Sequence, residues 1–201
     1  MYTNNLTSSL FSLAINRNTS GASGYLALGG TPPVNFVNHF ASADILITNV
    51  LGYPKTYDFY MIEVGTLEVG NMSLDGGKYI VDSGTSLNKM PTKIADAINK
   101  QFSPPAVYNT NSGNYNVNCT AKAPNLSVTI GGTVFYINPI DIIVVSGTDA
   151  NGNRKCISGV SDGGHNATED LYILGDVFMK NVVSVFDIGE SKMRFAAREF
   201  Y

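Results

Sequence analysis

The sequence predicts a mainly β fold, a single lobe of antiparallel sheets and hairpins with one or two short helices. The chain of 201 residues contains 20 Gly, 11 Tyr and 10 Phe but only 14% charged residues, a composition that favours strands and turns over surface helices. Short apolar segments alternate with turn residues along its whole length. Because no repeat, low-complexity tract or linker divides the chain, residues 1–201 are expected to form one domain.

The first half of the chain contains short segments rich in β-branched and aromatic residues, which predict strands. These segments are 10–15, 25–30, 45–47, 57–64 and 67–69. The first two are expected to pair across a polar turn as a hairpin. Asp75-Gly76-Gly77 is a hairpin signal that leads into the apolar segment 79–81.

The second half contains the one segment with clear helical spacing, Pro91–Phe102, which is expected to be a core helix ended by Ser103-Pro104-Pro105. Gly131-Gly132 predicts a hairpin between its two flanking apolar segments. The strands expected after the helix are 126–130, 134–137, 140–145, 171–174, 182–186 and 193–196. A polar loop is expected over 148–155.

The stretch around Asp82 is the strongest candidate for chemistry. An apolar segment, Tyr79–Val81, runs directly into this carboxylate, and burial there disfavours its charged form. Gly84 allows a tight turn that aims backbone N–H groups back at the carboxylate. Short hydroxyl donors are supplied by Ser83, Thr85 and Ser86. Such an arrangement suits acid–base chemistry, although an aspartate that merely stabilises a turn or caps a helix is the alternative.

Several function classes are disfavoured by charge and motif content. The net charge of −3 and the absence of a basic cluster argue against nucleic acid as a partner. No apolar run is long enough to span a membrane. His39 and His165 lack ligand-spaced partners, so no metal site is expected. No cofactor is expected, because neither a phosphate-binding loop nor a dinucleotide-binding glycine motif is present.

Two features indicate the secretory route, to the exterior or to a vacuole. The chain has two cysteines without a Cys-x-x-Cys motif. It also has candidate N-glycosylation sequons at Asn5, Asn18, Asn71, Asn118, Asn125 and Asn166. Met1 is followed by polar residues rather than a signal peptide, so the natural start is expected to lie upstream.

The ordered motifs resemble the C-terminal lobe of a pepsin-like (A1 family) aspartic protease, and secreted fungal members are the most similar in style. Residues 80–87 resemble its catalytic segment, and residues 173–178 resemble the element that crosses behind the catalytic loop. The opening and closing hairpins of that lobe are matched by residues 10–30 and 185–196. Cys119 and Cys156 fall where the lobe places its disulfide.

The resemblance implies an endopeptidase that acts on peptide or protein substrates. Asp82 would be one of two aspartates that share a proton and activate water. Ser83 would brace the paired loops, Gly84 would approach the substrate backbone, and the Thr85 hydroxyl would bond an outer carboxylate oxygen. Phe59 and Ile80 would line a prime-side pocket. Asp176 and Asp187 are expected to be structural hydrogen-bond acceptors instead.

The second aspartate is not found in this sequence, because no other Asp is followed by Ser or Thr and then Gly. In the family that residue comes from an N-terminal lobe, so this lobe is expected to be absent and the isolated chain to be inactive. The partner required would be the missing lobe or, less favoured, a second copy of the chain in a retroviral-type homodimer. A non-catalytic binding or inhibitor scaffold, or a truncated pseudo-protease, is the alternative function.

Overall fold

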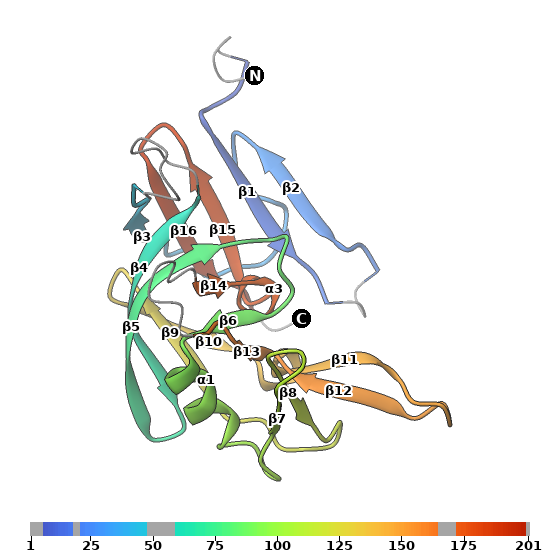
Figure 1. Ribbon diagram of the computed structural model, residues 1–201. Helices are drawn as coiled ribbons and strands as arrows, with labels where there is room; N and C mark the ends of the chain where they lie inside the picture. The colour runs from blue at the N-terminus through green and yellow to red at the C-terminus, as the bar shows by residue number, and fades with distance from the viewer. Residues whose placement is uncertain (1–5, 18–20, 48–58, 165–171, 200–201) are drawn as a thin grey trace.

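A computed structural model describes residues 6–17, 21–47, 59–164 and 172–199. Strands dominate these residues and form three sheets, accompanied by three short helices (Figure 1). The predicted fold class, a mainly β lobe of antiparallel sheets and hairpins, is confirmed. Within the described residues, no helix combines the length and the apolar character needed to cross a lipid bilayer.

The first sheet joins the two ends of the chain. Its strands, in spatial order, are β2 (Gly24–Leu28), β1 (Leu10–Ile15), β15 (Val182–Asp187), β16 (Lys192–Ala197) and β3 (Ala41–Asp44). All neighbours are antiparallel, and Leu10 lies opposite Asp187. The predicted opening and closing hairpins are therefore present side by side. The strand expected at 45–47 is wrong, because β3 ends at Asp44.

The second sheet carries the candidate site. Its strands, in spatial order, are β10 (Thr133–Ile137), β9 (Leu126–Ile130), β4 (Met61–Val69), β5 (Met72–Val81), β14 (Tyr172–Leu174), β6 (Asn88–Met90) and β13 (Val160–Asp162). Two of its pairings are parallel, β14 with β5 and β13 with β6. The predicted arms at 57–64 and 67–69 form one strand, β4, within the described residues.

The expected turn at Asp75-Gly76-Gly77 is wrong, because these residues lie inside β5. The reversal between β4 and β5 instead uses Gly70, whose φ of 57° lies in the left-handed region, and Asn71. Gly76 is needed for close packing, since a Cβ there would collide with the carbonyl oxygen of Val64 on β4. The glycine pair that resembles a turn signal therefore allows β5 to pack closely against β4.

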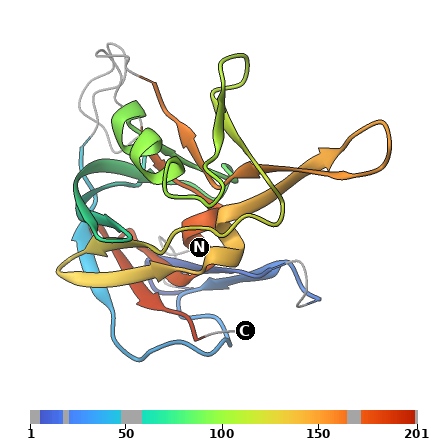
Figure 2. The ribbon, with the colours of Figure 1, turned by 90° about the horizontal axis from the view of Figure 1, so that it is seen from below.

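The third sheet consists of two projecting hairpins, β11 (Ile143–Thr148) with β12 (Arg154–Ser158) and β7 (Val107–Asn109) with β8 (Asn114–Val117). Figure 2 shows both leaving the body of the molecule. The strand expected at 140–145 is partly wrong, because helix α2 (Pro139–Ile142) occupies its first half. Asn138 caps α2 by accepting from the Ile140 N–H, and buried Asp141 pairs with Arg17 at 2.6 Å.

The other two helices pack against the second sheet. Helix α1 (Thr92–Asn99) starts after Pro91 and buries Ile94, Ala95 and Ile98, as an amphipathic core helix does. Helix α3 (Asp176–Met179) follows β14 directly and buries Val177, Phe178 and Met179. Three rings from different parts of the chain meet edge-on in the core, with centroids 5.8–6.5 Å apart: Phe135, Phe178 and Phe195.

Candidate active site

Asp82 lies at the end of β5, where the strand gives way to a tight turn, and its side chain is half-buried. One carboxylate oxygen, Oδ1, accepts a hydrogen bond from the Gly84 N–H at 2.8 Å. The other, Oδ2, accepts one from the Thr85 hydroxyl at 2.6 Å. Because a carboxylate can accept about four hydrogen bonds, each oxygen keeps capacity for a further donor. The turn thus fixes the plane of the carboxylate without saturating it.

Gly84 permits this arrangement through close approach. A Cβ at this position would lie 3.1 Å from Asp82 Oδ1, tighter than ordinary carbon–oxygen contact. A side chain would therefore push the carboxylate away from the N–H group that holds it. The sequence predicted the aimed N–H group, and the structure adds the steric reason for glycine.

The loop after Asp82 is held from behind by β14 and α3. The Asp82 N–H donates to the Leu174 carbonyl oxygen at 3.1 Å, which continues the parallel pairing of β5 with β14. The first backbone N–H groups of α3, from Asp176 and Val177, donate to the carbonyl oxygens of Thr85 and Ser86 at 2.9 and 3.1 Å. Residues 173–178 therefore cross behind the loop, as the sequence resemblance implied.

Two further residues fix this crossing, and the sequence did not single out either for it. A Cβ at Gly175 would collide with the carbonyl oxygens of Thr85 and Leu87, so only glycine allows β14 to approach the loop. The fully buried Asn88 accepts from the Gly175 N–H through its side-chain oxygen at 2.9 Å. Asn88 lies six residues after Asp82, between Leu87 and Lys89, and nothing local in the sequence marks it for this role.

Asp176 and Asp187, both expected to be structural acceptors, differ in the hydrogen bonds that their carboxylates accept. Asp187 accepts from Arg194 at 2.7 Å and from the Glu190 N–H at 3.0 Å, so its structural role is confirmed. The Oδ1 atom of Asp176 is buried, and within the described residues no hydrogen bond reaches it. Burial raises the pKa of Asp176 above its ordinary value, Lys180 opposes this shift, and the charge of Asp82 adds to it.

The remaining predicted site residues lie at different depths. Ser83 and Ser86 are exposed on the loop surface. Ile80, two residues before Asp82 on β5, is 7% exposed, whereas Phe59 is 37% exposed just before β4. Two hollows in the described part of the molecule lie elsewhere, so neither places Phe59 with Ile80. The prime-side pocket therefore stays a prediction.

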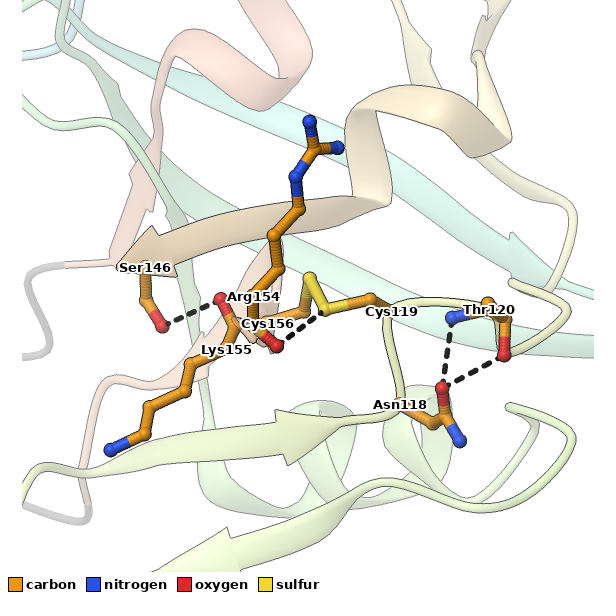
Figure 3. The surroundings of a disulfide bond; sticks show 7 residues. All are labelled: Asn118, Cys119, Thr120, Ser146, Arg154, Lys155 and Cys156. Atoms are coloured by element: carbon orange, nitrogen blue, oxygen red, sulfur yellow. Dashed lines mark hydrogen bonds between the residues drawn. A yellow bond between two sulfur atoms is a disulfide. The ribbon is translucent and has the colours of Figure 1, made fainter. Parts of the chain in front are cut away.

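The two cysteines form a disulfide, with a Cα–Cα distance of 5.2 Å (Figure 3). It links the segment that follows β8 to β12, beside a hollow of about 630 Å³. The two cysteines are 37 residues apart in sequence. Closing a loop of that length stabilises a fold by roughly 4 kcal/mol in the chain-entropy model. The bond is remote in sequence from Asp82 and joins the two hairpins to each other.

Three of the six sequon asparagines lie within the described residues, and all three, Asn71, Asn118 and Asn125, are exposed. Asn5, Asn18 and Asn166 lie outside the described residues. Among the described residues, no three His, Cys, Asp or Glu side chains are arranged to hold a metal ion. His165 lies outside the described residues.

Comparison with known proteins identifies the family. The family model described as eukaryotic aspartyl protease matches residues 1–198. A probable aspartic-type endopeptidase of Aspergillus fumigatus is 49% identical over 203 residues, covering 98% of this chain and 46% of that protein. Cathepsin D of Chionodraco hamatus is 31% identical, covering 93% and 46%. An acid protease of Saccharomycopsis fibuligera is 25% identical, covering 94% and 47%.

The chain spans about half the length of these relatives. The matched part nevertheless includes almost every residue of the chain, with the Asp82 loop and the crossing element behind it. By sequence, the chain belongs to the eukaryotic aspartyl protease family, whose members are aspartic-type endopeptidases.

Proposed function

We propose that this chain is the C-terminal lobe of a pepsin-like aspartic endopeptidase, in which Asp82 is one of two catalytic aspartates. The observation that carries the proposal is the loop at the end of β5. It holds both oxygens of a half-buried carboxylate with its own donors and is itself fixed by backbone bonds from β14 and α3. Coverage of just under half of each relative supports a single lobe.

In the proposed mechanism, Asp82 contributes a carboxylate of fixed orientation. The Gly84 N–H and the Thr85 hydroxyl each occupy one oxygen, so the remaining lone pairs are free to bind a water molecule. A second aspartate from the other lobe would share one proton with Asp82, because two like charges at close range do not both ionise. The ionised partner then takes a proton from water while the protonated partner donates to the scissile carbonyl.

The substrate class proposed is peptide or protein, and the proposed location is secreted or vacuolar. Location is supported by the Cys119–Cys156 disulfide, since such bonds persist in oxidising compartments. Cleavage then depends on the N-terminal lobe, which we expect to supply half of every substrate contact. On this view the 201-residue chain alone does not cleave protein.

The test compares full-length protein carrying Asp82→Asn with full-length protein carrying Asp75→Asn. Asp75 is exposed on the same strand as Asp82 and serves as the matched control. Cleavage of a denatured protein substrate at acid pH is expected to fall roughly 10³-fold or more in the first variant and to be unchanged in the second. Retained activity in Asp82→Asn protein would contradict the assignment.

Two other measurements separate the alternatives. Wild-type full-length protein that binds denatured protein without cleaving it would indicate a non-catalytic scaffold. Cleavage by the 201-residue chain alone, with a dimer in sedimentation, would replace the two-lobe proposal with a symmetric homodimer in which two copies of Asp82 face each other.

A further inference from the structure

We infer that Asn118 carries an N-linked glycan, rooted beside the disulfide between the two projecting hairpins. The inference rests on the secretory location proposed above, and not on proteolysis. A sequon alone marks only a candidate, and three candidates are described, at Asn71, Asn118 and Asn125. The local structure of the sequon separates Asn118 from the other two.

Within its sequon, the side chain of Asn118 is held in one orientation by Thr120. The Oδ1 atom accepts from both the Thr120 N–H and the Thr120 hydroxyl, each at 2.9 Å. Because a backbone N–H can only donate, the atom facing it must be the amide oxygen. The amide nitrogen, the atom that receives the sugar, therefore points away from Thr120 (Figure 3).

This arrangement is local, so it can form before the chain has folded. The bond from the Thr120 N–H spans two residues, as in an Asx-turn, and needs no distant partner. Both Asn118 and Thr120 are exposed, in the irregular segment after β8, as suits a bulky, solubilising modification of the surface. The amide nitrogen of Asn118 makes no hydrogen bond to the described residues, so modifying it breaks no contact there.

The other two described sequons lack this arrangement. Ser127, the hydroxyl residue of the Asn125 sequon, is 3% exposed inside β9 and is held between two neighbouring strands. Ser73, the hydroxyl residue of the Asn71 sequon, lies in β5 opposite Glu68. At neither site does the sequon hydroxyl bond the asparagine within the described residues.

The surroundings of Asn118 also suit a sugar. The adjoining hollow of about 630 Å³ is lined by amide, hydroxyl and cationic side chains, including Asn109, Asn116, Ser146 and Lys155. Such groups hydrogen-bond to the hydroxyls of a sugar. The neighbouring Cys119–Cys156 bond forms in the same oxidising route in which N-glycans are attached. A glycan at this point would stand over the hollow and beside the disulfide.

The test is site mapping on full-length protein secreted by a yeast host through an added signal peptide. After endoglycosidase treatment, peptides are examined by mass spectrometry for the N-acetylglucosamine left on asparagine. We expect the remnant on Asn118 in the wild type and in Thr120→Ser protein, which keeps a hydroxyl. It should be lost completely in Thr120→Ala protein, which keeps the asparagine.

Two results would overturn the inference. One is an Asn118 peptide recovered unmodified from secreted wild-type protein, whether or not Asn71 and Asn125 are modified. The other is a remnant on Asn118 that persists in Thr120→Ala protein, since the proposed geometry depends on that hydroxyl. Neither readout involves cleavage of a substrate, so a protein that is glycosylated but inactive would contradict only the proposed function.

Discussion

The loop at Asp82 and the disulfide-linked hairpins are both turns at the surface, but they are fixed in different ways. The Asp82 loop is bonded through its backbone to α3, which is largely buried, and to β14, whose last residue, Leu174, is buried. The hairpins project from the body (Figure 2). They are joined to each other by the Cys119–Cys156 bond. They are joined to the body by contacts such as the hydrogen bond from the Tyr115 hydroxyl to Asp96 at 2.7 Å and that from the Asp162 N–H to the Gly113 carbonyl oxygen at 3.0 Å.

The difference shows which part of this fold must be positioned precisely, the loop at Asp82, and which part must only stay attached, the hairpins. A catalytic carboxylate must be held within a fraction of an ångström, which rigid backbone bonds from core elements provide. The hairpins need only stay attached, and a disulfide achieves this by restricting the unfolded chain more than by shaping the native one. In full-length protein, which each activity measurement below uses, changes at the loop should therefore affect activity, and changes at the hairpins should affect stability.

The largest effect is expected from removing the disulfide with Cys119→Ala and Cys156→Ala together. The free energy of unfolding should fall by about 4 kcal/mol, because the unfolded chain regains the entropy of an open loop. Proteolytic activity per folded molecule should be unchanged. Urea unfolding followed by circular dichroism measures the free energy of unfolding. Steady-state kinetics, normalised by active-site titration, measure the activity per folded molecule. A loss of kcat in the folded variant would break the comparison.

Gly175→Ala should have the next largest effect. The added Cβ meets two backbone carbonyl oxygens that cannot move away, so we expect a loss of about 3 kcal/mol together with loss of activity. Gly30→Ala is the matched control, because a Cβ there meets no atom within 4 Å. Unfolding in urea compares the two variants. Equal stability of both would mean that the crossing behind the loop is looser than described.

Thr85→Val should leave the fold nearly intact while lowering kcat roughly tenfold. The variant removes the hydroxyl that holds Oδ2 of Asp82, a loss of about 1.5 kcal/mol in fixing the carboxylate. KM should change little, and Thr85→Ser, which restores the donor, should recover most of kcat. Steady-state kinetics on a peptide substrate measure this. If the serine variant were as impaired as the valine variant, the hydroxyl would not be the cause.

The smallest effect is expected at Asp176 and depends on pH. Burial raises its pKa, so the native state binds this proton more tightly than the unfolded state does. The free energy of unfolding therefore falls as pH rises from the ordinary value of 3.8 through the raised value, as Asp176 ionises. Asp176→Asn removes that fall, so its Tm advantage over wild type should grow from acid to neutral pH. A Tm difference that stays constant with pH would contradict this account.

Much of the fold could be predicted from local pattern. The hairpin around Gly131-Gly132 and the strand at Leu10–Ile15 follow from apolar segments beside turn residues. The wrong predictions share one cause, which is that distant contacts decided the local structure. Asp75-Gly76-Gly77 looks like a turn, but these residues lie in a strand in which Gly76 packs closely against the Val64 backbone of the neighbouring strand. Likewise, helix α2 occupies the start of the strand expected at 140–145. The short strands β6 and β13 depend on pairing with distant segments, β6 with β13 and β14, and β13 with β6.

The hydrogen bonds of Asp82 within its own loop could be predicted from the sequence, but the residues that support this loop from behind could not. Asp82, Gly84 and Thr85 lie within four residues, so the hydrogen bonds among them follow from the local sequence. The roles of Asn88 and Gly175 depend on a segment that follows Asp82 by most of the remaining chain. Such a contact gives no local signal in the sequence. For the same reason, the sequence does not predict that Oδ1 of Asp176 is buried without a hydrogen bond from the described residues.

The parallel pairing of β5 with β14 has a consequence for synthesis of the protein. The residues that stand behind Asp82, from Leu174 to Val177, leave the ribosome long after the motif itself has emerged. Until then Asp82 lies on a segment that lacks its hydrogen bonds to β14 and α3, and β1 has not yet paired with β15. The Asp82 loop therefore gains its backbone support only after residues 174–177 have been synthesised.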